Sequence, residues 1–252
     1  MRLVFVALVL LICSPALAIT GNAPSAAGFA ARSIVMIVDA RGDLCTGTAL
    51  GPDLVLTAAH CVMRPLDYQV KVYPTGQSIK VASALRHPQF DTASYAASRA
   101  TADVALLKLA SPLPDGVVPA QLAPPRRVAV GETLTVAGFG VTLAGTARGL
   151  GQPRMAKLAV TGKPGSLQIR LHDPATRNLL SGLGACTGDS GAPVFDGQVA
   201  SVIGQVIGVV SWSTAPNDEE GCGGLTGVTP LILYRAWIVE TAGKLGAPAV
   251  GR

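Results

Sequence analysis

The chain has 252 residues, of which 49% are hydrophobic and only 14% charged, so it can bury a sizeable core and a disordered protein is disfavoured. Its formal charge of +5 comes from scattered basic residues without a basic run, so we expect no nucleic-acid partner. The 29 glycines and 18 prolines favour many short strands joined by turns.

The first eighteen residues have the layout of a signal peptide. Arg2 supplies a positive charge, residues 3–12 form an uninterrupted apolar run, and Pro15 breaks that run. Residues 16–18 read Ala-Leu-Ala, which is the small-residue pattern at which signal peptidase cleaves. The alternative, an uncleaved membrane anchor, would need a longer apolar segment. We therefore predict a secreted or periplasmic protein with no membrane span after cleavage.

The first half of the remaining chain reads as a series of short strands. Residues 33–39 are β-branched and apolar, as in a buried strand, and Gly51 and Pro52 mark a turn between two others. Residues 69–73 and 78–84 alternate apolar and polar side chains, as half-buried antiparallel strands do. The expected strands of this half are 33–39, 45–50, 53–57, 69–73, 78–84 and 104–109.

A proline-rich stretch at residues 112–125 reads as the connection to a second half of similar character. Helical spacing of apolar residues occurs only in residues 231–244, just after Pro230, and predicts a C-terminal amphipathic helix. The expected strands of the second half are 133–138, 156–161, 167–171, 192–195 and 205–212. Two sets of strands favour a pair of small β-barrels, but periodicity alone does not separate that architecture from a sandwich.

Three residues have the chemistry of an activated nucleophile. Ser190 lies among glycines, His60 follows a strand end, and Asp103 precedes an apolar strand. A serine hydroxyl needs a base, and imidazole titrates near neutrality, so His60 can take the proton while Asp103 orients and stabilises the imidazolium. Each residue alone has a commoner structural explanation. Their order along the chain, His then Asp then Ser, favours a catalytic triad.

The glycines around the nucleophile point to a second element of the same site. They allow the backbone to turn sharply and leave the N–H groups of Gly188 and Ser190 free. Two such donors can bind the oxyanion that develops when a serine attacks a carbonyl. We therefore predict an oxyanion hole formed by Gly188 and Ser190.

Four motifs resemble those of the chymotrypsin/trypsin family. Residues 57–61 (TAAHC) match the family's histidine motif, and residues 103–107 (DVALL) closely match its aspartate motif. Residues 188–193 (GDSGAP) match its serine motif, with Ala192 where glycine is usual, and residues 211–213 (SWS) resemble its Ser-Trp-Gly substrate-binding strand. Together these motifs are highly specific for the family.

The resemblance extends from Ile19 to about Lys244 and implies an architecture. The expected fold is all-β, with two six-stranded antiparallel β-barrels, a C-terminal α-helix and the active site in the cleft between the barrels. The expected division is a signal peptide at 1–18 and a trypsin-like peptidase domain at 19–252, with barrels at about 19–120 and 121–230 and the helix at 231–244.

The cysteines indicate disulfides rather than a metal site. Cys13 lies in the signal peptide, so four cysteines remain, and four allow three pairings. Export to an oxidising compartment favours disulfides, and no pair has the C-x-x-C spacing of a zinc site. The family resemblance implies the pairs Cys45–Cys61 and Cys186–Cys222.

The new N-terminus resembles the mature start of the family. Cleavage after Ala18 exposes Ile19, whose α-ammonium, by resemblance, pairs with the carboxylate before the nucleophile, Asp189. A buried carboxylate needs such a cation because an unpaired one is costly. Our hypothesis is that signal peptidase makes the activating N-terminus without a propeptide. The alternative is cleavage a few residues away, followed by trimming by a second protease.

The resemblance also gives the substrate pocket. Gly184 stands where members that cleave after lysine or arginine carry an aspartate, so the floor is neutral. We predict cleavage after uncharged residues, aromatic or aliphatic. The pocket residues implied by the resemblance are Gly184, Ala185, Ser211, Trp212, Ser213 and Gly227.

The function predicted from these residues is a secreted serine endopeptidase that acts through an acyl-enzyme. One alternative is a non-catalytic protease-fold binding protein, although all three triad residues are present. Another is an esterase-like α/β-hydrolase, whose triad runs in the order Ser, Asp, His. We expect protein or peptide substrates, a proteinaceous inhibitor as a candidate partner, and a monomer. No cofactor or metal is expected, because the acids are sparse and unclustered.

Overall fold

A computed structural model describes residues 19–65, 67–161, 166–197 and 203–247, so the predicted signal peptide lies outside the described residues. Six antiparallel strands close into the first barrel in the order β1-β2-β3-β6-β5-β4. These strands are β1 (Ile34–Asp39), β2 (Leu44–Gly51), β3 (Leu54–Thr57), β4 (Tyr68–Val72), β5 (Gln77–Arg86) and β6 (Ala105–Leu109).

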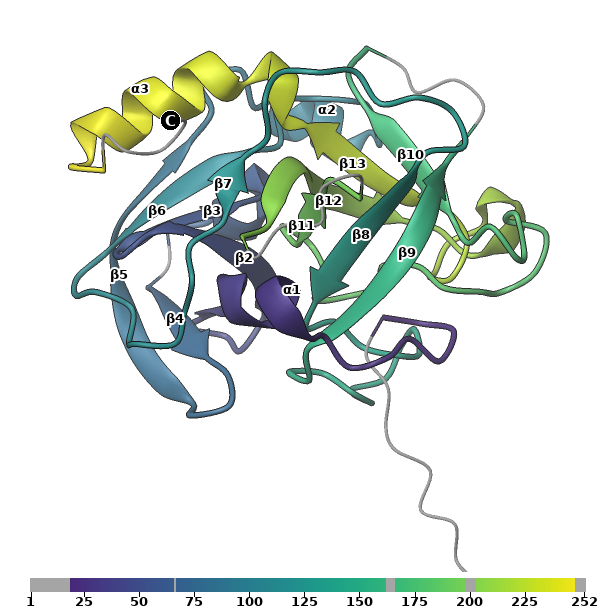
Figure 1. Ribbon diagram of the computed structural model, residues 1–252, viewed down its shortest axis with the longest axis horizontal. Helices are drawn as coiled ribbons and strands as arrows, with labels where there is room; N and C mark the ends of the chain where they lie inside the picture. Colours follow the sequence, from purple (N-terminus) through teal and green to yellow (C-terminus); the bar gives the residue numbers. More distant parts are fainter. Residues whose placement is uncertain (1–18, 66, 162–165, 198–202, 248–252) are drawn as a thin grey trace, which may run out of the picture.

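The second barrel is also a ring of six antiparallel strands, in the order β11-β8-β9-β10-β13-β12, closed by pairing of β11 with β12. These strands are β8 (Thr133–Gly138), β9 (Arg154–Val160), β10 (Ile169–His172), β11 (Pro193–Phe195), β12 (Gln205–Ser213) and β13 (Thr226–Pro230). The connection between the barrels adds the short strand β7 (Gln121–Leu122), which runs parallel to β12. The prediction of two six-stranded barrels is confirmed (Figure 1).

Several elements differ from the sequence prediction. Strand β13 was not expected, because its sequence TGVTP is short and has no apolar alternation. Strand β10 begins at Ile169, two residues later than predicted. Short helices α1 (Gly28–Ser33) and α2 (Thr92–Ala96) and 3-10 turns at Ala59–Val62 and Pro216–Asp218 were also not foreseen.

The C-terminal helix is shorter than predicted. Helix α3 spans Arg235–Lys244, and Leu231–Leu233 forms a 3-10 turn instead of the first helical turn. Tyr234 separates the two, because its N–H closes the turn on the Leu231 carbonyl and its φ of −117° is not helical. Within the described residues, no helix is long and apolar enough to cross a membrane.

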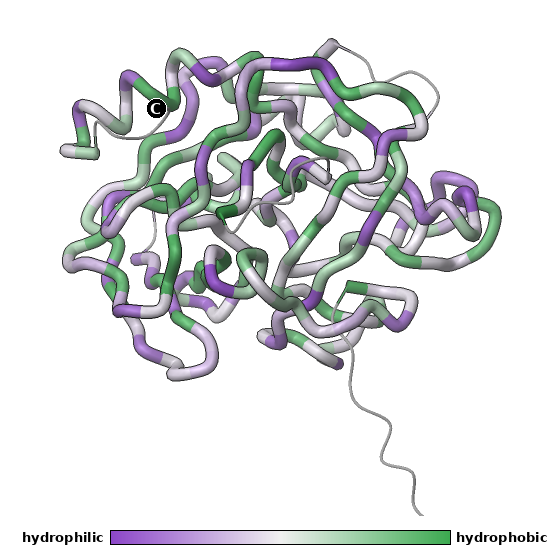
Figure 2. Tube along the Cα trace, in the orientation of Figure 1, coloured by the Kyte–Doolittle hydropathy of each residue, from purple (hydrophilic) through white to green (hydrophobic). Residues whose placement is uncertain are grey.

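The two barrels share one of their hydrophobic cores. The first four residues of β8, TLTV, alternate in hydropathy, and the apolar ones, Leu134 and Val136, are buried in the second barrel; Figure 2 colours the whole chain by this property. One buried cluster joins Leu54 and Leu56 of the first barrel to Phe139 and Phe195 of the second, and to Ile238 of α3. Helix α3 therefore covers a core to which both barrels contribute.

His87 takes part in this packing beside the C-terminal helix. Its ring meets the rings of Tyr234 and Trp237 edge-on, with both centroid distances at 4.9 Å. Burial lowers the pKa of His87, so the imidazole stays neutral at physiological pH. His87 thus packs the end of strand β5, in the first barrel, against the C-terminal helix.

Candidate active site

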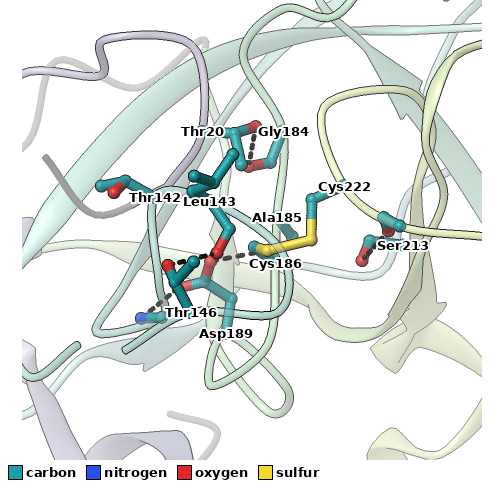
Figure 3. The surroundings of a disulfide bond; sticks show 12 residues. Thr20, Thr142, Leu143, Thr146, Gly184, Ala185, Cys186, Asp189, Ser213 and Cys222 are labelled. Carbon is teal, nitrogen blue, oxygen red and sulfur yellow. Dashed lines mark hydrogen bonds between the residues drawn. A yellow bond between two sulfur atoms is a disulfide. The ribbon is translucent and has the colours of Figure 1, made fainter. Parts of the chain in front are cut away.

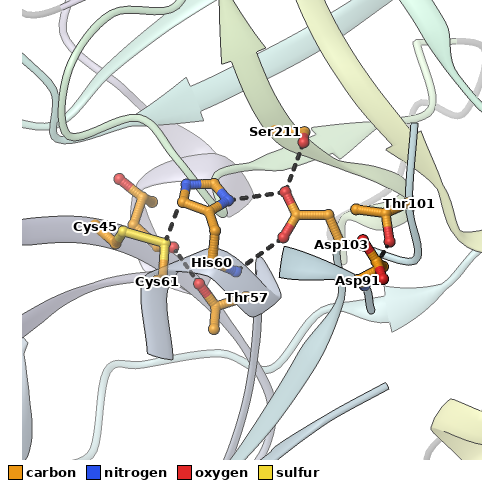
Figure 4. A network of polar contacts seen from close by, with 9 residues as sticks. Cys45, Thr57, His60, Cys61, Asp91, Thr101, Asp103 and Ser211 are labelled. Atoms are coloured by element: carbon orange, nitrogen blue, oxygen red, sulfur yellow. Dashed lines mark hydrogen bonds and ion pairs between the residues drawn. A yellow bond between two sulfur atoms is a disulfide. The ribbon is translucent and has the colours of Figure 1, made fainter. Parts of the chain in front are cut away.

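The His60 and Asp103 side chains form a closed hydrogen-bonded unit (Figure 4). Strand β3 leads into the 3-10 turn that carries His60, and Asp103 lies just before β6, the neighbour of β3 in the sheet. His60 Nδ1 lies 2.8 Å from Asp103 Oδ2, and His60 N donates to Asp103 Oδ1 at 2.9 Å. Ser211 Oγ adds a third hydrogen bond to Oδ2 at 2.5 Å. Three donors compensate for the burial of this carboxylate.

This arrangement determines which imidazole nitrogen is reactive. Because Nδ1–H donates to Asp103, the neutral ring of His60 leaves Nε2 as an acceptor. Nε2 lies 3.9 Å from Cys61 Sγ, and His60 lines an open cleft. The unit can therefore accept a proton from a group in the cleft and stabilise the resulting imidazolium.

An aromatic ring covers one face of His60. Tyr95, on α2, stacks on the imidazole with a centroid distance of 4.7 Å and an interplanar angle of 15°. Asp91 caps α2 by accepting a hydrogen bond from Ser94 N. Burial raises the pKa of Tyr95 to about 12, and the negative charge of Asp103 adds to the shift, so the phenol stays protonated. Sequence reasoning missed Tyr95, because nothing in its local sequence indicates that it reaches His60.

The Gly188 N–H faces away from the hydrogen bond that holds its own peptide plane. The Thr187 carbonyl accepts a hydrogen bond from Val141 N at 2.8 Å. C=O and N–H point in opposite directions in a trans peptide, so Gly188 N–H faces the other side. Among the hydrogen bonds of the described residues, none uses this N–H. The φ of +94° at Gly188 explains why glycine stands here.

The Ser190 N–H is oriented in the same way. The Asp189 carbonyl accepts from Ala192 N at 2.9 Å, so the N–H of the Asp189–Ser190 peptide faces away from that bond. In the part of the chain that the structure describes, Ser190 N–H also has no hydrogen-bond partner. Two free N–H donors therefore flank the serine predicted as the nucleophile, as an oxyanion-binding site requires.

His60 and Ser190 open into one cleft of about 420 Å³ between the barrels. The cleft is lined by residues that include His60, Tyr95, Ala185, Gly188, Ser190, Ser211, Trp212 and Ser213. Of the hydrogen bonds made by the described residues, none joins Ser190 Oγ to His60 Nε2. Such contacts are often long before substrate binds and tighten in the substrate complex.

The structure brings four of the six predicted pocket residues to this cleft. Gly184 and Gly227 are not among the residues that line it. A Cβ at Gly227 would lie 1.9 Å from the indole of Trp212, so this glycine makes room for the indole instead. Gly184 packs against the Gly223 backbone, and its carbonyl accepts a hydrogen bond from Thr20 N at 3.1 Å.

Thr226 supports the cleft wall from behind, and sequence reasoning missed it. It is fully buried, and its Oγ1 accepts a hydrogen bond from Ala185 N at 2.9 Å. A neutral hydroxyl therefore stands behind the cleft wall at Ala185. No sequence motif indicated this contact, because it depends on the pairing of β13 with its neighbours.

Asp189 is a fully buried carboxylate with few partners (Figure 3). Gly140 N donates to Oδ1 at 2.8 Å and Cys186 N to Oδ2 at 2.9 Å. Burial outweighs these two hydrogen bonds and raises the pKa of Asp189 to about 7. Ile19 is also fully buried, but before cleavage its nitrogen belongs to a peptide bond and carries no charge. The chain before cleavage therefore leaves this carboxylate without a cation among the described residues.

Both disulfides implied by the resemblance are present. Cys45 bonds to Cys61 across 16 residues beside the histidine, and Cys186 bonds to Cys222 across 36 residues beside the serine loop. Chain-entropy arguments give about 3 kcal/mol of stabilisation for a short loop such as the first. Cys45, His60 and Cys61 lie close enough to suggest a metal site, but the two sulfurs are bonded to each other and are not thiolates.

The comparisons with known proteins agree with this geometry. The family model described as Trypsin matches residues 19–238. The chain belongs to the trypsin family. This trypsin-family chain is 27% identical over 221 residues to snake venom serine protease rhinocerase 4 of Bitis rhinoceros, covering 84% of this chain and 83% of the relative. It is 29% identical over 219 residues to a trypsin of Phaedon cochleariae, covering 78% of each chain.

The fold of this trypsin-family chain is similar to that of mouse neuropsin. The TM-score is 0.69 at 22% identity, with 87% of this chain and 98% of neuropsin covered. At this identity the similarity concerns the fold alone. The family match and the protease relatives establish a serine endopeptidase that acts on protein substrates.

Proposed function

We propose that this serine endopeptidase hydrolyses peptide bonds through Ser190, with His60 as its base and Asp103 as the orienting carboxylate. The observation that carries the proposal is the Asp103–His60 unit, whose free Nε2 opens into the same cleft as Ser190. Ser190 Oγ attacks the peptide carbonyl while Nε2 takes its proton. The imidazolium then protonates the leaving amine, and the C–N bond breaks to leave an acyl-enzyme. Water, deprotonated by His60, releases the acid and restores the serine.

The tetrahedral intermediate carries a negative oxygen that needs donors. The free N–H groups of Gly188 and Ser190 support an oxyanion hole at this position. Fixed donors stabilise the developing charge without reorganising, and removal of one such donor typically costs about 3–4 kcal/mol of transition-state stabilisation. We assign most of the rate enhancement that the triad does not supply to these two backbone N–H groups.

The cleft supports cleavage after uncharged residues. Ala185 and Ser213 line its second-barrel side, and the hydroxyl of Thr226 stands behind Ala185, so that side presents no carboxylate for lysine or arginine. The two carboxylates that line the cleft, Asp39 and Asp43, belong to the first barrel. A library of peptides that differ only in the residue before the scissile bond tests this preference. Faster cleavage after arginine than after leucine or phenylalanine would reject it.

Activation by the new N-terminus is part of the proposal. The Ile19 side chain is already buried, and Thr20 is bonded to Gly184, so cleavage after Ala18 would release an ammonium near the Ser190 loop. Its pairing with Asp189 would supply the cation that this buried carboxylate lacks. N-terminal sequencing of the active enzyme tests the hypothesis, and a start other than Ile19 contradicts direct activation by signal peptidase.

We further infer that the enzyme is exported and works as a monomer. The signal-peptide pattern at residues 1–18, the two disulfides and the venom relative support export. A proteinaceous inhibitor that occupies the cleft remains a candidate partner. Size-exclusion chromatography with light scattering tests the oligomeric state, and a dimer mass contradicts the monomer.

The decisive test of the nucleophile is labelling by a fluorophosphonate, which phosphonylates an activated serine. The wild-type chain with its natural signal peptide is expected to be labelled, and Ser190→Ala is expected to lose the label. Ser111→Ala is a matched control because Ser111 is an exposed serine that does not line the cleft or the pocket beside it, and it should label like wild type. An unlabelled wild type that starts at Ile19 would favour the non-catalytic binding protein.

A further inference from the structure

Strand β2 of the first barrel reaches the Ser190 loop through one threonine. Thr46 is fully buried, and its hydroxyl donates to the Gly188 carbonyl oxygen at 2.9 Å. The same hydroxyl accepts a hydrogen bond from Phe139 N at 3.1 Å, and Thr46 N donates to the Ser190 carbonyl at 2.8 Å. Thr46 therefore holds the carbonyl groups on both sides of Asp189.

These contacts complete the anchoring of the loop. Four peptide planes link residues 187–191, and each plane moves as a rigid unit. Val141 N and Ala192 N hold the first and third carbonyls, while the hydroxyl and the N–H of Thr46 hold the second and fourth. The Thr46 hydroxyl is the side-chain anchor among these four, so it can be removed without changing the backbone.

The loop lies directly against the strand that carries this anchor. Gly191 has a φ of +79°, and a Cβ there would lie 2.1 Å from Thr57 Oγ1 and 2.4 Å from the Thr46 carbonyl oxygen. With no space between loop and strand, the position of Thr46 sets the position of the Gly188 peptide. The N–H groups of Gly188 and Ser190 belong to the two adjoining peptide planes, which share Cα atoms with the planes that Thr46 holds.

A second threonine on β2 provides a built-in comparison. Thr48 is two residues further along and projects to the same side of the strand. It is also fully buried, but its hydroxyl has no hydrogen-bond partner among the described residues. The two threonines therefore share strand, side and burial, and differ in whether the hydroxyl holds the Ser190 loop.

We propose that Thr46 is a positioning residue for the oxyanion hole, and this inference rests on the proposed catalytic role of Ser190. The hydroxyl keeps the Gly188 carbonyl turned toward β2, which keeps the neighbouring N–H groups directed at the cleft. Thr46 touches neither the substrate nor the reacting atoms, and it acts through the loop. Loss of the hydroxyl affects transition-state binding more than substrate binding, because the oxyanion exists only after attack.

Thr46→Val and Thr48→Val test the proposal as a matched pair of isosteric changes. Thr46→Val leaves Gly188 O and Phe139 N buried without their partner, whereas Thr48→Val removes a hydroxyl that bonds to nothing. We expect kcat for a peptide amide to fall about 10- to 100-fold in Thr46→Val, with KM within about twofold of wild type. Thr48→Val is expected to keep wild-type kcat.

A transition-state analogue separates positioning from general destabilisation. A peptide boronic acid forms a tetrahedral adduct with the nucleophile, so its affinity should fall in Thr46→Val by the same factor as kcat. Thr46→Ser, which keeps the hydroxyl, should restore most of kcat, and Thr46→Ala should not. If Thr46→Val does not fold, the Ser and Ala variants decide, because they differ only in this hydroxyl. A loss confined to KM overturns the inference.

Hydrogen exchange gives a readout that does not depend on activity. Amides of the peptide spanning residues 187–191 should exchange faster in Thr46→Val than in Thr48→Val or wild type. Equal exchange and equal kcat in the two valine variants would overturn the role of Thr46. An unlabelled, inactive wild type would instead reject the catalytic role of Ser190, while the exchange data still decide whether Thr46 holds the loop.

Discussion

The two halves of the site are braced differently, although each is braced by the other barrel. The Asp103 carboxylate, from the first barrel, receives a hydrogen bond from Ser211 on β12 of the second. The Gly188 carbonyl, from the second barrel, receives one from Thr46 on β2 of the first. The first bond has a charged acceptor and the second a neutral one, and charge-assisted hydrogen bonds are about twice as strong.

We call the His60–Asp103 pair the rigid half of the site, because hydrogen bonds hold it in the folded chain. We call the loop that carries Ser190 the conditional half, because it encloses a carboxylate that has no cation among the described residues. Three hydrogen bonds converge on Asp103 and are present in the chain before cleavage. The serine loop instead surrounds Asp189, a buried carboxylate with two backbone donors and a raised pKa. The base is thus assembled by folding alone, whereas the carboxylate inside the Ser190 loop lacks a cation among the described residues, which the proposed activation would supply.

Asp103→Asn should give the largest effect on the rigid half. The amide would favour the wrong tautomer of His60 and would not stabilise the imidazolium, so kcat should fall about 10⁴-fold near neutral pH. Steady-state kinetics on a peptide amide measures this loss. The fluorescence-detected melting temperature serves as the control for folding, and a loss below about tenfold with intact folding would remove Asp103 from the triad.

Asp189→Asn should impair the conditional half, the Ser190 loop, and leave the rigid half, the His60–Asp103 pair, intact. If cleavage activates the enzyme as proposed, this change removes the partner of the Ile19 ammonium, and kcat/KM measured by steady-state kinetics should fall about 100-fold as the oxyanion donors lose order.

The uncleaved precursor tests the direction in which the stability contributed by Asp189 changes with pH. With the nucleophile replaced (Ser190→Ala), the uncleaved chain leaves Asp189 without a cation among the described residues, and burial raises the pKa of Asp189 in the folded chain to about 7, above its ordinary value of 3.8. The stability that this group contributes is therefore complete below pH 4 and is lost as the pH rises to about 7. Urea unfolding across this range should show the decline, and Asp189→Asn should abolish it. A precursor whose stability is flat over this range contradicts an unpaired Asp189.

Tyr95→Leu should give the smallest effect, because it removes only the ring that covers His60. Cation–π attraction of about 0.5–2 kcal/mol stabilises the imidazolium that forms during the reaction, so kcat should fall a few-fold. Tyr95→Phe keeps the ring and should retain the wild-type kcat in steady-state kinetics on a peptide amide. Equal kcat values for the Leu and Phe variants would show that the stack is only packing.

The sequence was sufficient to nominate residues whose proposed role is encoded in a contiguous motif. His60, Asp103 and Ser190 each lie in a short pattern that can be read locally, and the fold follows from the family to which these patterns point. The residues that hold them, Thr46 and Tyr95, act through tertiary contacts across different segments. No local pattern distinguishes Thr46 from Thr48, because the difference appears only when the Ser190 loop is placed against β2.

The pocket shows why strand register cannot be read from a motif. Pairing of β12 with β13 shifts at a bulge between Val210 and Trp212, which brings Trp212 opposite Gly227. A shift of one residue moves side chains to the other face of a strand. Gly227 therefore lies under the indole while Thr226 reaches Ala185, a difference that the resemblance alone could not predict.

The buried cluster shared by the barrels has a consequence for folding. Leu54 and Leu56 lie in one buried cluster with Phe139 and Phe195, so separating the barrels would expose these side chains, although each barrel also holds a buried cluster of its own. Exposing these side chains costs about 25 cal/mol for each Å² of apolar surface. Heating should therefore melt both barrels in one cooperative transition, and a cut in the connection would yield fragments that fold only together. The cleft that holds the proposed catalytic groups is therefore lost in the same unfolding transition.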